Sequence, residues 1–572
     1  MQAISRSVWL LAIAFLAVTI IGCDEPVATK PGKTTKAKVT KAGAKTKDSK
    51  TKTPPVKTHA QWAKNAEQRT PKDFRVTNPR WDENPEGGSM GGGYTASSRR
   101  RNFESGRVDE VVGKKVSAVV AASLEVGPTL VVWIMDRTPS AKKLVMEAGT
   151  GARSIYNQPE IRAAIGGDEK KLLTAVLAFD DKVEMVLDPP VSDAQAVNSA
   201  FDKIQTGTSG KEMTFTAIQT ALDQYMPMRM KDRREIVVVV VTDEAGDDRE
   251  KVDGIVDVVK KSSIPVYVVG SPAPWGQTNP YLPARKQAEV GDEAFPTYGP
   301  ESVAPERVNV QTWGGGKGGG GYQEMGGSGS GDGLVDSGFG PYHLERLCRA
   351  SGGEFIVARA GGGGAQSWPT GSEIQFDPDT LQKYTPLYMS QKEYDAAVGS
   401  NKAWSGLIAA SKLAPVTVSG NPQSNFTKRN EAEFSRQLNT AQQFAAVHSP
   451  EIDQFYALLA PGEGDRDKLK SARLQAEFDL AMGRVLATKV RLDGYNAMLA
   501  ALKRGKNFEK ESSRTWHIEQ SDKIETGSAI QKMAEKAHMY LDRVVKEHPG
   551  TPWADMAEKD TKVQLGWEWR ES

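Results

Sequence analysis

The chain has 572 residues, of which 38% are hydrophobic and 55 are glycine. This length has room for several domains, and the low apolar content predicts ordered domains separated by flexible segments. The formal net charge of +2 indicates no general preference for nucleic acid or acidic partners, so we expect no nucleic-acid partner. Cysteine occurs only at Cys23 and Cys348, far apart in the chain, and we predict no intramolecular disulfide.

The N-terminal segment is typical of an export signal. Arg6 precedes an apolar run from Val8 to Ile21 that is too short for a comfortable membrane span. The run ends in Ile20-Ile21-Gly22-Cys23, which resembles a lipobox, the motif at which bacterial lipoproteins are lipidated and cleaved. The resemblance implies a signal peptide over 1–22, a diacyl-type (palmitate-like) lipid on Cys23 and a membrane-anchored, extracytoplasmic protein, periplasmic or surface-facing. The alternative is an uncleaved signal anchor with an incidental cysteine.

Residues 23–113 are predicted to form a disordered tether that is rich in lysine and glycine. Between Asp24 and Thr58 there are ten lysines, three acidic residues and no hydrophobic period. Such a segment buries too little apolar surface to fold. Two interpretations stay open: a solvated spacer, or a basic stripe that lies on anionic lipid or wall polymer.

Order is expected from about Lys114, where strand and helix patterns begin to alternate. Continuous apolar runs predict strands that are buried on both faces of a mainly parallel sheet. They are Thr129–Met135, Leu172–Phe179, Ile236–Val241 and Ile264–Val269. Helical stretches lie between them: Ser140–Ile165, Asp193–Ile204, Thr216–Tyr225 and Glu250–Lys261. A short turn at 180–182 predicts a hairpin and hence one antiparallel edge strand, so the whole pattern predicts a doubly wound α/β domain over 114–360.

The stretch from 271 to 336 interrupts this alternation and is rich in proline and glycine. We interpret it as a mobile insertion that is dispensable for folding, because long loops add closure entropy only slowly. A helix over Tyr342–Ser351, ended by Gly352-Gly353, and a strand over Glu354–Ala358 are expected to complete the domain.

Residues 375–572 contain no clear strand pattern, and an all-α region is predicted there. Helical spacing covers Glu431–Ala446, Asp465–Lys503 and Ile530–Glu547. Pro549-Gly550 is expected to end the last of these helices, and Thr551 and Pro552 to begin another over Pro552–Gly566, which makes a helical hairpin. The segment 548–554 weakly resembles the inter-helix turn of tetratricopeptide-like repeats, although the sequence has no second copy.

Polar residues stand where the predicted strands end, at the sheet edge where α/β domains bind ligands. Asp136, Thr138 and Ser140 follow the first strand, Thr214 lies just before or in the first turn of a helix, and Asp243 ends a later strand. Asp-x-Thr-x-Ser, a central Thr and Thr-Asp after an apolar strand together resemble the metal-ion-dependent adhesion site of von Willebrand factor A domains, in the right order over roughly 125–360. The resemblance implies a Rossmann-like fold in which these five residues hold a divalent ion.

The donor set supports a metal independently of the resemblance. Two carboxylates and three hydroxyls are hard oxygen ligands, suited to Mg²⁺ or alternatively Mn²⁺ or Ca²⁺. The sequence departs from the family pattern with Thr138 in place of Ser and Glu244 in place of Gly, and Thr216 competes with Thr214 for the middle role. The alternative is that these residues only cap helices and turns.

The resemblance implies a binding module that holds a carboxylate of a protein partner through the metal. We expect no enzymatic activity, because no Gly-x-Ser-x-Gly elbow follows a predicted strand and no Cys–His pair is recognisable. The alternative function is a metal-free structural lipoprotein of the cell envelope that assembles through its helical C-terminal region.

Overall fold

The computed structural model describes residues 107–273, 308, 310, 337–358, 377–413, 416 and 422–572. Its first folded part contains the strands β1 (Thr129–Asp136), β2 (Leu172–Phe179), β3 (Val183–Val191), β4 (Glu235–Val241), β5 (Val266–Gly270) and β6 (Phe355–Val357). They form a six-stranded sheet in the order β3-β2-β1-β4-β5-β6. All neighbours pair in parallel except β3, which is antiparallel to β2. The predicted mainly parallel sheet with one antiparallel edge strand is confirmed.

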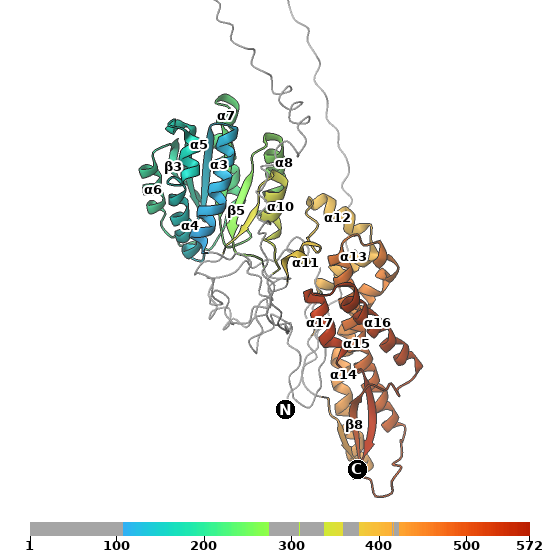
Figure 1. The fold of residues 1–572 in the computed structure, drawn as a ribbon. Helices are drawn as coiled ribbons and strands as arrows, with labels where there is room; N and C mark the ends of the chain where they lie inside the picture. The colour runs from blue at the N-terminus through green and yellow to red at the C-terminus, as the bar shows by residue number, and fades with distance from the viewer. Residues whose placement is uncertain are drawn as a thin grey trace, which may run out of the picture. The chain divides into compact units, whose positions relative to one another are not determined.

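Helices cover both faces of this sheet (Figure 1). One face packs against α3 (Ser117–Val126), α4 (Lys142–Ile155), α5 (Pro159–Ile165) and α6 (Ala194–Lys203), and the other against α7 (Thr214–Lys231), α8 (Val252–Ser262) and α10 (Tyr342–Ser351). Short turns η2 (Glu169–Lys171) and η3 (Arg249–Lys251) precede β2 and α8. Along β1, Trp133 faces the first core and Val132 the second. Because successive strand residues point to opposite faces, a strand covered on both sides needs an unbroken apolar run.

The folded domain begins earlier than predicted. α2 (Val108–Val111) and η1 (Val112–Val116) lead into α3 without a break. Val108, Val112, Val116 and Val120 are all buried in the core. Their spacing of four residues places them on one helix face. Residues 108–113 therefore belong to the domain and not to the tether, while the rest of the predicted tether, the signal segment and Cys23 lie outside the described residues.

The predicted single helix over Ser140–Ile165 is two helices. α4 ends at Ile155, and α5 starts with Pro159 at its first position. Proline has no N–H to donate and fixes a backbone angle that suits a helix start, so it separates the two helices.

In α10, Cys348 is a buried free thiol packed into the core.

The predicted insertion is corrected at two positions. Val308 and Val310 are buried, and both belong to the core of the C-terminal region. Val310 pairs with Val416 in an isolated parallel bridge, and the backbone N–H of Val308 donates to Glu477 at 3.2 Å. Two apolar side chains in a Gly- and Pro-rich stretch give no periodic signal, so only the fold identifies them as core. Val308 and Val310 therefore belong to a core and not to a mobile loop, and most of 271–336 lies outside the described residues.

The C-terminal region is largely helical, as predicted. Its helices are α11 (Pro378–Gln382), α12 (Gln391–Gly399), α13 (Lys402–Ser411), α14 (Glu431–Leu459), η4 (Ala460–Lys468), α15 (Ala472–Lys503), α16 (Ser528–Glu547) and α17 (Pro552–Thr561). The predicted hairpin of α16 and α17 is present. The hydroxyl of Thr551 accepts from the N–H of Ala554 at 3.3 Å and so caps α17.

The prediction of an all-α C-terminal region needs one correction. β7 (Asn425–Thr427), β8 (Thr515–Ser521) and β9 (Gly566–Glu571) form a three-stranded antiparallel sheet. The strands are short and their partners lie far apart in the sequence, so no local pattern predicts the pairing. In β8 the buried Trp516 and Ile518 alternate with half-buried neighbours, which is the period of a strand.

Among the described residues, no helix combines the length with the apolar character that a bilayer span requires.

Candidate functional site

Three loops meet at the carboxyl edge of the sheet. β1 and β4 are parallel neighbours with Met135 opposite Val241, so the residues that follow each strand emerge side by side. The chain leaves β1 toward α4 on one face, whereas α7 covers the other face. This is the point at which the strand order reverses, where α/β domains place their ligand sites. The third loop precedes α7 and reaches the same edge, because the N–H of Gly207 donates to the carbonyl of Arg137 at 2.7 Å.

Asp136 is fully buried at the end of β1. One of its carboxylate oxygens accepts from the backbone N–H of Thr138 at 2.9 Å and from the Thr138 hydroxyl at 2.7 Å. The other accepts from the hydroxyl of Thr242 at 2.8 Å. Burial raises the pKa of Asp136 to about 6, although these hydrogen bonds act in the opposite direction. The hydroxyl of Ser140 lies 3.1 Å from that of Thr138, so the first loop places its predicted ligands together.

Two other predicted ligands carry buried oxygen atoms that lack a hydrogen-bond partner. These are Oδ1 of Asp243 and Oγ1 of Thr214. Asp243 is 6% exposed and Thr214 is fully buried. Burial first, and then the charge of Asp136, raise the pKa of Asp243 to about 7. A buried oxygen with no donor costs free energy, so these two oxygens are free to contact a bound cation.

Thr214 is the first residue of α7 and lies against the loop that carries Asp243. A Cβ built on Gly246 would come within 3.0 Å of its Oγ1. The competing residue, Thr216, is engaged elsewhere, because its hydroxyl donates to Asp248 and it also contacts Lys251. Of the two threonines, Thr214 is therefore the one whose hydroxyl is available for the middle position.

Glu212 was not predicted, yet it completes the acidic centre. Carboxylate oxygens of Asp136, Glu212 and Asp243 lie within 4.8 Å of one another, and all three residues are buried. Burial, followed by the charges of Asp136, Glu244 and Asp243, raises the pKa of Glu212 to about 11. Its only sequence signal is its place two residues before Thr214, in a loop without periodicity.

The donor set fits a divalent cation. The charge of Asp136 raises the pKa of Asp243 and of Glu212, and the charge of Asp243 raises that of Glu212; a positive ion would offset this repulsion. The unpartnered oxygens of Asp243 and Thr214 are hard donors of the kind that Mg²⁺, Mn²⁺ and Ca²⁺ prefer. Capping alone does not account for three buried carboxylates at one point. The five predicted residues with Glu212 therefore make a candidate metal site.

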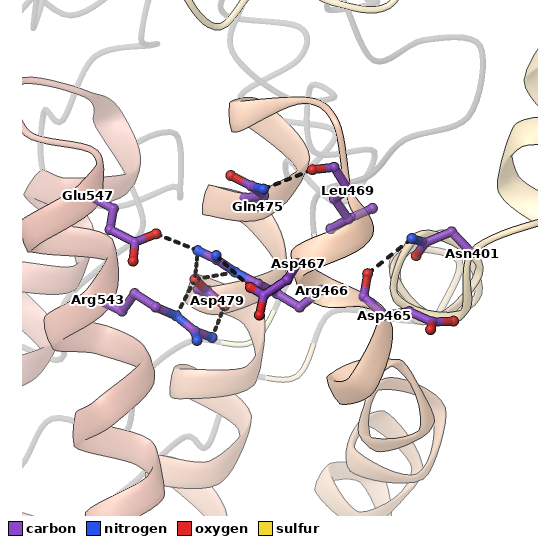
Figure 2. Close-up of polar contacts among 9 residues, drawn as sticks. All are labelled: Asn401, Asp465, Arg466, Asp467, Leu469, Gln475, Asp479, Arg543 and Glu547. Carbon is purple, nitrogen blue, oxygen red and sulfur yellow. Dashed lines mark hydrogen bonds and ion pairs between the residues drawn. The ribbon is translucent and has the colours of Figure 1, made fainter.

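A second group of possible ligands lies in the C-terminal region, where atoms of Asp479, Glu547 and His548 are within 4.8 Å of one another. Figure 2 shows that Asp479 lies between two guanidinium groups, and its oxygens accept from Arg466 and Arg543 at 2.5–3.0 Å. Arg466 also donates to Glu547 at 2.8 Å. The guanidinium charges neutralise the carboxylates and would repel a cation, so we interpret the group as a structural ion-pair network.

The comparisons with known proteins agree with the geometry. Residues 160–294 match the family described as von Willebrand factor type A domain. The matched range includes Glu212, Thr214 and Asp243 and begins after the loop of Asp136. No curated protein matches the chain.

Among solved structures, a conserved hypothetical protein, BatB from Bacteroides thetaiotaomicron, is similar at 17% identity. The match covers 27% of this chain and 72% of that chain with a TM-score of 0.20, values at which the likeness adds no functional information. The family match and the six-stranded α/β fold lead to the same identification: the chain contains a von Willebrand factor type A domain.

Proposed function

We propose that this chain is a protein-binding module whose von Willebrand factor type A domain takes up a divalent cation at its acidic sheet edge. The observation that carries the proposal is the convergence of three buried carboxylates, from Asp136, Glu212 and Asp243, on one point. The buried, unpartnered oxygens of Asp243 and Thr214 support it. Thr138 and Ser140 complete the oxygen shell from the first loop.

A bound cation supplies an electrophilic centre that accepts an oxygen from a partner, and we propose a carboxylate of a protein as that oxygen. The protein residues would hold the ion and set the net charge of the site. Asp136 is oriented by Thr138 and Thr242, whereas Asp243 keeps one oxygen without a donor. A cation would favour ionisation of Glu212, whose pKa is about 11 without one, so three carboxylates could then hold the ion.

The test is direct measurement of metal binding by the full chain. Mn²⁺ is titrated into chelator-treated protein, and free Mn²⁺ is followed by its electron paramagnetic resonance signal. We expect saturable binding of one ion per chain in the wild type and strongly weakened binding in Asp136→Ala. Asp223→Ala is the matched control, because Asp223 is an exposed aspartate of α7 and should bind as the wild type does. Absence of saturable binding in the wild type would refute the proposal and favour the metal-free structural function.

Lipid attachment at Cys23 and an extracytoplasmic location are proposed from the sequence run Ile20-Ile21-Gly22-Cys23. Cys23→Ser should abolish incorporation of labelled fatty acid and release the protein from the membrane fraction. Unchanged labelling and fractionation in that variant would contradict the proposal, and neither result depends on the metal site.

A further inference from the structure

The helix that carries Thr214 receives no cap from the residue before it. Met213 precedes α7 and makes no side-chain hydrogen bond to its first turn. The N–H groups of a first helical turn have no partner within the helix and need an acceptor from elsewhere. Asp248, in the loop after β4, supplies it: its oxygens accept from the N–H of Phe215 at 3.0 Å and from that of Thr216 at 2.7 Å.

Asp248 is committed to this role. Its side chain is 3% exposed, and it also accepts from the Thr216 hydroxyl. Lys251 lies 3.4 Å away and offsets its charge. Because both oxygens are occupied by α7, Asp248 differs from Asp243, which comes from the same loop and keeps an oxygen without a partner.

Further contacts join the loop after β4 to the loop before α7. The N–H of Glu212 donates to the carboxylate of Asp247 at 3.1 Å, and the N–H of Asp247 donates back to the carbonyl of Glu212 at 2.8 Å. Gly246 has a φ of +81° and lies against Thr214. A side chain there would be strained by the left-handed backbone and would press on the Thr214 hydroxyl. The two loops therefore hold each other in place.

We infer that Asp248 is a positioning residue of the candidate metal site: by capping α7 from the loop after β4, it sets where the Thr214 hydroxyl lies relative to Asp243. The inference rests on the proposed function, because only that function makes Thr214 a metal ligand. Asp248 acts only through the helix end. Groups that orient metal ligands typically change metal affinity by about 10- to 100-fold when they are removed, and a similar loss is expected here.

The test compares Mn²⁺ affinity, by electron paramagnetic resonance on the full chain, in the wild type, Asp248→Asn and Asp248→Ala. Asparagine keeps one acceptor oxygen, so it should lose part of the affinity, and alanine should lose about 10- to 100-fold. Asp193→Ala is the matched control, because Asp193 caps α6 through the N–H groups of Gln195 and Ala196 at 3.2 and 3.1 Å. It should bind Mn²⁺ as the wild type does.

The outcomes distinguish an effect of Asp248 on the position of Thr214 from an effect of its charge and from a loss of folding. Amide hydrogen exchange in β1 and β4 verifies that each variant keeps its fold, and if Asp248→Ala does not fold, Asp248→Asn carries the test. A folded Asp248→Ala with wild-type affinity would overturn the inference while leaving the proposed function intact. Equal losses in the Asn and Ala variants would also overturn it, because they would indicate a loss of charge and not of position. Failure of the wild type to bind Mn²⁺ would instead remove the proposed function, and the inference with it.

Discussion

Replacing Asp243 by asparagine should stabilise the metal-free domain, although it removes a metal ligand. Asp243 is 6% exposed, and burial together with the charge of Asp136 raises its pKa to about 7 from an ordinary value of 3.8. A carboxyl group whose pKa is higher in the folded state contributes most to stability when it is protonated. That contribution is lost as the pH rises from about 4 through about 7. Asparagine does not titrate, so the variant does not lose this stability as the pH rises.

The size of the effect follows from the pKa. Between about pH 5 and the folded pKa near 7, each pH unit lowers the stability of the wild type by about 1.4 kcal/mol relative to the variant. The advantage of Asp243→Asn should therefore grow by about 3 kcal/mol from about pH 5 to about pH 8, with chelator present.

Amide hydrogen exchange in peptides from β1 and β4 of the full chain measures this difference, because those strands form the centre of the domain. Exchange should slow in Asp243→Asn at the higher pH after correction for the intrinsic rate. Saturating Mn²⁺ should slow exchange in the wild type but not in Asp243→Asn, as expected for a stabilisation of about 2.7 kcal/mol at a hundredfold excess over Kd. Asp223→Asn, a change at an exposed aspartate, should behave as the wild type does at each pH and with Mn²⁺. An advantage of Asp243→Asn that does not vary with pH would refute the reasoning, as would a loss of stability at the higher pH.

Further predictions concern glycine packing at the site and the core of the C-terminal region. Gly246→Ala should cost about 1 kcal/mol, because a φ of +81° is strained for alanine, and should weaken Mn²⁺ binding by displacing Thr214; unchanged affinity would contradict this. Asp479→Ala should destabilise the C-terminal region by about 3–5 kcal/mol in urea unfolding, because Arg543 and Arg466 both lose the buried carboxylate between them and Arg466 keeps only its contacts with Asp467 and Glu547; a loss below about 1 kcal/mol would exclude a structural ion pair there. Val310→Asp should speed exchange in the C-terminal helices, because it buries a charge in their core, whereas Val447→Asp, at a side chain 63% exposed, should not; equal effects would argue against the placement of Val310.

The predicted ligands could be found from the sequence because they follow strands that local pattern identifies. An unbroken apolar run such as that of β4 predicts a buried strand wherever it occurs, because a strand covered on both faces has no place for polar residues. Once β1 and β4 are parallel neighbours, Asp136 and Asp243 must emerge at one edge. Their proximity can therefore be predicted without knowing the conformations of the loops after β1 and β4.

Glu212 could not be found in that way. Its position depends on the reciprocal bonds between its backbone and Asp247, and on the cap that Asp248 gives to α7. These partners lie 32 to 35 residues apart in the sequence and belong to irregular loops, which have no hydrophobic period. The sequence shows where the acidic residues are, but it does not show the tertiary contacts that orient their side chains.

The same distinction holds for the whole protein. Sequence alone determines the doubly wound sheet, its antiparallel edge strand and most of the helices, because these depend on spacing along a short stretch of chain. Tertiary structure alone determines the three-stranded sheet of β7, β8 and β9, the burial of Val308 and Val310 in a distant core, and the placement of Asp479 between two arginines. Each of these is a contact between segments that carry no periodic signal, and its free energy appears only when the chain brings the partners together.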